Sequence, residues 1–205
     1  MILVVEGRHD IEFLRRLSSI LHVARPAVPD LAAYERRGEL LFVPAGGGDF
    51  RPWLTRLSAL GRSEFYLFDR ETPPVSQQRE LWAAALNARP GCRAFVTRRR
   101  SLENYLHFDA IREGLGMTVT FSSDDDVAET IARKSFRPSA ELPTWEHLSR
   151  RAKRRQRERI KQRLNTAAVE RMTLARLVAC DPAGEILGWF AVLSELLTDP
   201  SHGGA

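Results

Sequence analysis

A short apolar run near the start of the chain, Ile2-Leu3-Val4-Val5, leads directly into Glu6-Gly7-Arg8-His9-Asp10. β-Branched and apolar residues that end at Glu-Gly predict a short buried strand followed by a tight turn. After Asp10 the apolar residues recur at helical spacing, at Ile11, Phe13, Leu14, Leu17, Ile20 and Leu21. The chain is therefore expected to open with a strand, an acidic turn and an amphipathic helix.

The same alternation continues through the first 100 residues. Further strands are predicted at 40–43, 65–68 and 92–96, helices at 50–60, at 76–88 and from about residue 101, and a loop at 24–38. Short apolar strands that alternate with helices predict an α/β fold, with a parallel sheet of about four strands flanked by helices.

The half of the chain after Val119 has a helical pattern instead. Helices are predicted at 127–134, about 145–163, 166–178 and 182–197, with a loop at 135–143 and a frayed end at 201–205. We therefore expect two units. Residues 1–118 form an α/β core, and residues 119–205 form a helical extension that contains the basic helix 145–163.

Length and composition exclude several classes of protein. With 205 residues, 43% of them hydrophobic and 28% charged, the chain suits a folded unit rather than a disordered or fibrous one. No apolar run approaches the roughly 20 residues of a membrane span, and the first apolar run is too short for a signal peptide. Cys92 and Cys180 fit neither a disulfide framework nor a zinc site. The expectation is a cytoplasmic protein without a membrane partner.

Acidic residues follow three of the four predicted strands. They are Glu6, Asp10, Asp69, Glu71 and Glu103. Any one of them alone is explained by a helix cap or a turn. Because ligands bind beyond the carboxyl ends of the strands in such sheets, the five acids are expected to converge at one edge. Oxygen-rich sites of this kind suit Mg²⁺ or Mn²⁺ and go with phosphate substrates.

Together these motifs resemble a Toprim domain, the metal-dependent module of topoisomerases, primases and certain nucleases. The family pattern is a Glu after the first strand and an Asp-x-Asp after the third, here Glu6 and Asp69-Arg70-Glu71. Leu102-Glu103-Asn104-Tyr105-Leu106 and Gly46-Gly47-Gly48 add a resemblance to Toprim nucleases of the OLD type and their stand-alone relatives. The resemblance covers about residues 1–110.

The resemblance implies a Toprim-like, Rossmann-like fold with a divalent metal site. It implies metal ligands at the five acids, and a general acid–base role for Glu6. Glu71 departs from the family pattern, because its side chain is one methylene longer than the usual Asp. The resemblance also implies a catalytic lysine, for which Lys161 is the first candidate and Lys153 the second. Larger OLD proteins contain an ATPase domain. This sequence has no Gly-x-x-x-x-Gly-Lys-Ser/Thr loop, so the expected partner is a separate ATPase chain.

The positive charge of the chain is local. Residues 150–163 contain nine Lys or Arg and one acid, a net +8, so the rest of a chain of net +5 carries −3. Such a run favours nucleic-acid phosphates, although a solvated helix face is the alternative. The predicted nucleic-acid contacts are Arg98, Arg99, Arg100, Arg150, Lys153, Arg154, Arg157 and Lys161.

The predicted function is that of a Mg²⁺- or Mn²⁺-dependent endonuclease that hydrolyses phosphodiester bonds of DNA or RNA by a one- or two-metal mechanism. The expected setting is a phage-defence or DNA-repair system with a separate ATPase. Two alternatives stay open: a primase-like nucleotidyl transferase, and a nucleic-acid-binding adaptor subunit of an ATPase complex. DNA or RNA substrate, nicking or double-strand cleavage, and oligomeric state are left open by the sequence.

Overall fold

The sheet contains the four strands that the sequence predicts. The computed structural model describes residues 1–46, 50–138 and 144–198. Four strands form one parallel sheet in the order β2-β1-β3-β4: β1 (Ile2–Val5), β2 (Leu41–Pro44), β3 (Glu64–Phe68) and β4 (Cys92–Val96). Because β1 and β3 are adjacent inner strands, the residues that follow them are neighbours at one edge.

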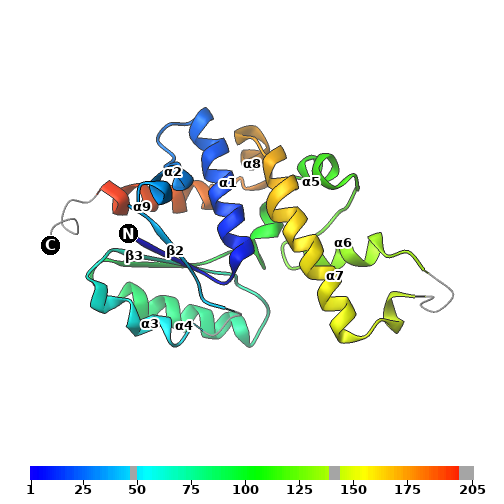
Figure 1. The fold of residues 1–205 in the computed structure, drawn as a ribbon, viewed down its shortest axis with the longest axis horizontal. Coiled ribbons are helices and arrows are strands. Elements are labelled where there is room, and N and C mark those ends of the chain that lie inside the picture. The colour runs from blue at the N-terminus through cyan, green and yellow to red at the C-terminus, as the bar shows by residue number, and fades with distance from the viewer. Residues whose placement is uncertain (47–49, 139–143, 199–205) are drawn as a thin grey trace.

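Alternate side chains of the inner strands face two separate cores. Leu3 and Val5 belong to the larger core, and Ile2 and Val4 to the smaller one. In Figure 1 the larger-core face is covered by α1 (Arg8–Ala24), α2 (Leu31–Arg36) and α9 (Glu185–Thr198), and the other face by α3 (Trp53–Arg56) and α4 (Val75–Asn87). The sheet is thus buried on both faces, as expected for parallel strands.

The remaining helices form a helical half. They are α5 (Phe108–Leu115), α6 (Val127–Ser135), α7 (Arg150–Arg163) and α8 (Leu174–Cys180). α6 and α7 lie side by side (Figure 1), and α7 runs on into a π-helical turn at Leu164–Ala168. None of the helices in the described ranges is by itself long and apolar enough to cross a membrane. α8 and α9 pass that test only as a pair, bent by 120°.

The predicted fold class, a parallel sheet of four strands flanked by helices with a helical C-terminal half, is confirmed. Both halves contribute to the larger core, which contains Phe13 and Leu17 together with Ile160, Leu164 and Trp189. The boundary between residues 118 and 119 stays a prediction.

Three predicted elements of the first half differ from the structure. The predicted loop 24–38 contains α2, which begins at Leu31. The side chain of Asp30 caps this helix by accepting a hydrogen bond from the Ala33 amide (3.3 Å). The predicted helix 50–60 is interrupted. It consists of the single turn α3 and a 3₁₀ turn at Ser58–Leu60, which ends at Gly61 in the left-handed region (φ 58°). From residue 101 the chain forms a 3₁₀ turn, Leu102–Tyr105, before α5 begins.

Caps explain the differences in the second half. The basic helix begins at Arg150 rather than 145, because the Ser149 side chain accepts from the Ala152 amide (3.2 Å). A 3₁₀ turn, Trp145–His147, precedes it. The predicted helix 166–178 is broken at the extended Met172, and Thr173 caps α8. Gly47, Gly48, part of the loop 135–143 and the end 201–205 lie outside the described residues.

Candidate metal centre

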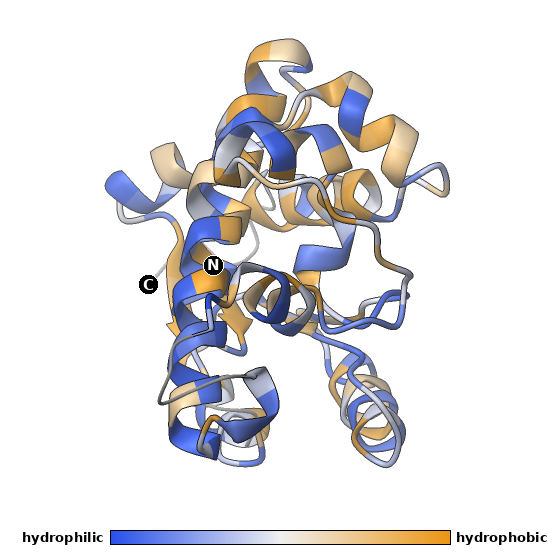
Figure 2. Cartoon of the chain, turned by 90° about the vertical axis from the view of Figure 1, so that its right-hand side faces the viewer, coloured by the Kyte–Doolittle hydropathy of each residue, from blue (hydrophilic) through white to orange (hydrophobic). Residues whose placement is uncertain are grey.

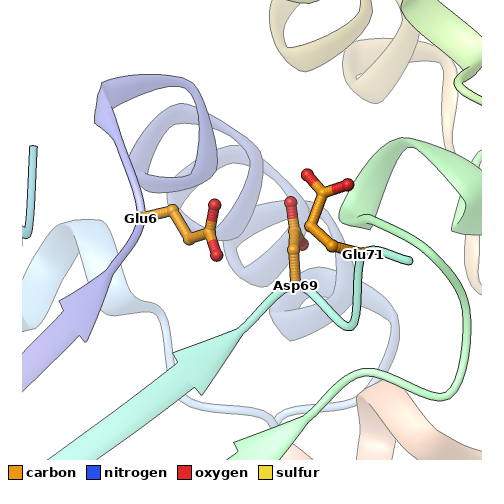
Figure 3. A group of neighbouring side chains, drawn as sticks. All are labelled: Glu6, Asp69 and Glu71. Carbon is orange, nitrogen blue, oxygen red and sulfur yellow. The ribbon is translucent and has the colours of Figure 1, made fainter. Parts of the chain in front are cut away.

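Three carboxylates meet where β1 and β3 end. Glu6 follows β1, and Asp69 and Glu71 follow β3. One oxygen from each lies within 4.8 Å of the others, and Figure 3 shows the side chains of Glu6 and Asp69 pointing into the space between the two strands. The adjacency of β1 and β3 therefore produces the convergence that the sequence predicts for these three acids.

Asp69 is the most deeply buried of the three. It is 3% exposed, and its Oδ1 accepts a hydrogen bond from the Leu102 amide (3.2 Å). Its Oδ2 is buried and has no hydrogen-bond partner among the described residues. Burial, together with the charges of Asp10 and Glu6, raises the pKa of Asp69 well above its ordinary value. A buried acceptor without a donor is expected where a cation binds.

Glu6 is held from the other side by an arginine of α4. The carboxylate Oε1 lies 2.7 Å from Nη2 of Arg79, in an ion pair. Burial raises the pKa of Glu6 to about 7, with Asp10 and Glu71 adding to the rise and Arg79 opposing it. Burial, the largest cause, thus outweighs the opposing effect of the arginine.

Glu71 has an unusual backbone conformation for a residue with a side chain. Its φ is 58°, in the left-handed region, and its amide donates to the Arg100 carbonyl (2.9 Å). The Arg100 guanidinium lies 3.5 Å from the Glu71 carboxylate. Strained backbone at an acidic cluster is a feature of functional sites, and it directs this carboxylate toward Asp69.

Asp10 and Glu103 lie outside this group of three. Asp10 is buried, and its Oδ2 accepts a hydrogen bond from the Gly7 amide (2.8 Å), so it caps the start of α1. Burial raises the pKa of Asp10 to about 6. Glu103 is 1% exposed and pairs with Lys161, whose Nζ lies 3.7 Å from Oε1.

The π-helical turn supplies the second partner of Glu103. Nδ2 of Asn165 donates to Glu103 Oε1 (2.8 Å) and to the Lys161 carbonyl (2.8 Å). Burial acts to raise the pKa of Glu103, but the Lys161 ammonium and the Asn165 amide outweigh it and lower the pKa. The Glu103 carboxylate in turn raises the pKa of Lys161, so both groups are charged.

The predicted nucleic-acid contacts divide into two sets. Some already have protein partners. Arg157 pairs with Asp126, and Lys153 donates to the Glu146 carbonyl (3.2 Å). The Arg99 guanidinium donates to two carbonyl oxygens and lies 4.9 Å above the Tyr105 ring, so it stabilises the fold instead of facing solvent.

The second set consists of exposed arginines without an ion-pair partner in the described ranges. All of them except Arg98 lie on the outer face of α7. Figure 2 shows this helix as hydrophilic along most of its length. Arg150 and Arg154 are exposed and have no ion pair within the described part of the chain, and the same holds for Arg151, Arg155 and Arg159. Arg98 is also exposed, and its backbone amide donates to Glu185. Unpaired guanidinium groups are the ones available to phosphate.

The donor set fits a hard divalent cation. Glu6, Asp69 and Glu71 offer only carboxylate oxygens, and Asp69 Oδ2 is a buried acceptor without a donor. Mg²⁺ and Mn²⁺ prefer such ligands. These three side chains therefore form a site that such an ion would occupy.

Comparisons with known proteins find a distant structural likeness. No family model and no curated protein matches the chain. The chain is similar to the C-terminal region of the OLD protein of Xanthomonas campestris pv. campestris. One solved structure of that region is 15% identical, with a TM-score of 0.49, and covers 95% of each chain. A second is also 15% identical, with a TM-score of 0.44, and covers 95% of this chain and 93% of the other.

Two residues at the centre escaped the sequence analysis. Arg79 shares the buried face of α4 with Ser76, Ala83 and Leu86, a spacing that marks it as an arginine within an apolar stripe. That pattern was a usable signal. Asn165 gave none, because its position depends on the π-helical turn.

Proposed function

We propose that the chain is a metal-dependent nuclease that hydrolyses phosphodiester bonds of DNA or RNA. The observation that supports this best is the group of three carboxylates, with its buried unpaired oxygen, a short distance from the buried Glu103–Lys161 pair. Acids that hold a cation beside a fixed ammonium suit a reaction in which negative charge develops on a phosphate.

Each side chain has a proposed role. Glu6, Asp69 and Glu71 would hold Mg²⁺ or Mn²⁺, which when bound activates water and polarises the phosphate. The Glu6 oxygen that Arg79 leaves free is the proposed ligand atom or proton acceptor. Lys161 would stabilise the charge on the scissile phosphate. Asp10 and Glu103 stay predicted metal ligands, at a site for one or two ions.

The outer face of α7 is the proposed path of the nucleic acid. Arg150 and Arg154 lie there, one turn apart and without ion-pair partners among the described residues. Neutralising phosphates with such groups releases counterions, so binding should weaken steeply with salt. A separate ATPase chain, within a phage-defence or DNA-repair system, is proposed as partner from the resemblance to OLD-type nucleases.

The test is cleavage of supercoiled plasmid and of a structured RNA in Mn²⁺, Mg²⁺ or EDTA. We expect metal-dependent cutting that is lost in Asp69→Asn. The matched control is Asp109→Asn, because Asp109 is a half-exposed aspartate at the start of α5 with an Arg112 partner. Consumption of nucleoside triphosphates would favour the nucleotidyl transferase. Nucleic-acid binding without cutting in any metal would favour the adaptor subunit.

A further inference from the structure

A buried arginine lies next to the candidate metal centre. Arg79 comes from α4 and is 3% exposed. Its guanidinium carbon lies 4.7 Å from the ring centre of Phe50, 5.8 Å from that of Phe68 and 5.1 Å from that of Trp82. Its Nη2 reaches out of this aromatic box to Glu6, at 2.7 Å.

Stability alone does not explain an arginine in this place. Burying a guanidinium carries a large desolvation cost, which an ion pair and ring contacts offset only in part. Replacement of a buried ion pair by apolar side chains of similar volume is often neutral or stabilising. An aromatic box could hold a methionine or leucine at no greater cost. The ion pair at 2.7 Å places the charge of Arg79 next to Glu6.

The aromatic rings hold the Arg79 guanidinium next to the more flexible side chain of Glu6. Three rings lie around the guanidinium group, and they hold its charge in place beside Glu6 Oε1. Glu6 has three rotatable side-chain bonds and follows the end of β1, with 19% of its side chain exposed. The arginine engages one carboxylate oxygen, and the carboxyl group faces Asp69 (Figure 3).

We propose that Arg79 is a positioning residue that holds Glu6 in the orientation in which it binds the metal ion. This inference rests on the proposed function. Partners that orient a metal ligand change metal affinity or activity by about 10- to 100-fold when they are removed. The fixed charge of Arg79 also repels the ion, so the proposal states that the gain from orientation exceeds this repulsion.

The test is Mn²⁺ affinity, measured by electron paramagnetic resonance of free Mn²⁺ on the full chain without nucleic acid. Arg79→Met keeps the volume and suits the aromatic box, and we expect it to bind Mn²⁺ about 10- to 100-fold more weakly than the wild type. Arg79→Lys keeps the charge and should recover part of the affinity. In a Glu6→Gln background, Arg79→Met should have no further effect, because the arginine acts through Glu6.

Arg89→Met is the matched control. Arg89 also forms an ion pair with a buried carboxylate, that of Glu64 at 2.9 Å, but Glu64 begins β3, at the opposite end from the metal centre. Its loss should lower stability and leave Mn²⁺ affinity within about twofold. Urea unfolding of each variant shows that it folds.

Three outcomes would overturn the proposal. In one, folded Arg79→Met binds Mn²⁺ as tightly as the wild type or more tightly. In another, Arg89→Met weakens binding as much as Arg79→Met does, which would indicate general loosening of the fold. The third is different in kind: a wild type that binds no Mn²⁺ contradicts the metal centre itself, and the proposed function with it.

Discussion

The ammonium nitrogen of Lys161 lies 3.7 Å from Oε1 of Glu103, and Glu103 is 1% exposed. The two residues come from segments that are far apart in the chain. Glu103 lies in the 3₁₀ turn after β4, and Lys161 lies near the end of α7. The pair therefore links the acidic edge of the sheet to the basic helix, and it keeps a charged lysine next to the metal centre.

Lys161→Met should lower the free energy of unfolding by about 3 kcal/mol, because it leaves the buried Glu103 carboxylate without its cationic partner. Adding Glu103→Gln should recover most of that loss without recovering cleavage. Urea unfolding and plasmid cleavage measure the two effects. If Lys161→Met were as stable as the wild type, the ion pair would contribute nothing to the fold.

Glu71→Gly and Glu71→Ala should separate backbone strain from ligand loss. Both remove the carboxylate, so both should lose Mn²⁺ binding. With φ at 58°, glycine fits where alanine is strained, so Glu71→Gly should be about 1 kcal/mol more stable than Glu71→Ala. Thermal unfolding checks the difference, and equal stability would show that the left-handed conformation is relaxed in the variants.

Gly114→Ala should disturb the π-helical turn. A Cβ at Gly114 would lie 2.5 Å from the carbonyl oxygen of Ala167 and 2.7 Å from the Cα of Ala168, so backbone must move. We expect a loss of about 1–3 kcal/mol in unfolding free energy, and weaker cleavage, since the same turn positions Asn165.

Gly188→Ala is the control for that substitution. Gly188 lies within α9, and a Cβ there would meet nothing within 4 Å. It should stabilise the protein by about 0.5–1 kcal/mol, as alanine does within helices. Destabilisation by both variants would mean that the contact between α5 and the π-helical turn does not cause the loss of stability in Gly114→Ala.

Arg154→Gln should change nucleic-acid binding, and Arg157→Gln should change stability. Arg154 is exposed and without an ion-pair partner in the described ranges, so its loss should weaken nucleic-acid binding and reduce the salt dependence by about one counterion. Arg157 is paired with Asp126, so its loss should mainly lower stability. Fluorescence anisotropy over a range of salt concentrations measures the first effect and urea unfolding the second. An unchanged salt slope in Arg154→Gln would remove the outer face of α7 from the nucleic-acid path.

In EDTA, stability should fall as the pH rises from about 4.5 to 7. The pKa of Glu6 rises from its ordinary 4.5 to about 7 on folding, so in this range the folded protein binds more protons than the unfolded chain. The stabilisation that comes from this proton uptake at Glu6 is complete below pH 4.5. It is lost as the pH rises through 7, the pKa of Glu6 in the folded protein. Thermal unfolding at pH 5 and pH 7.5 shows the trend, which should be smaller in Asp69→Asn. Mg²⁺ should restore stability at pH 7.5 by mass action.

The sheet and its acidic edge could be predicted from the sequence because they depend on local patterns. The apolar run of β1 ends at Glu6, and that of β3 ends one residue before Asp69. In a parallel sheet, a strand end fixes which edge the next residue occupies. The local patterns do not show that β1 and β3 are neighbours, which is seen in the structure.

The rest depended on contacts between distant segments. The sequence places Asp10 at the start of the first helix, but the hydrogen bond that its carboxylate accepts from the Gly7 amide is seen only in the structure. Whether an arginine of α7 is paired depends on α6, which places Asp126 beside Arg157 and leaves Arg154 without such a partner among the described residues. Helical periodicity identifies a face, but it does not say which neighbour occupies it.

The separation of Glu103 and Lys161 along the chain also has a consequence for synthesis. All five acids are translated before α6 and α7, so a growing chain has its acidic edge long before it has the lysine. A nascent chain on the ribosome, surrounded by RNA, would therefore lack one half of the proposed machinery until α7 has emerged and packed against α6. Order of synthesis would then protect the cell from a half-made nuclease.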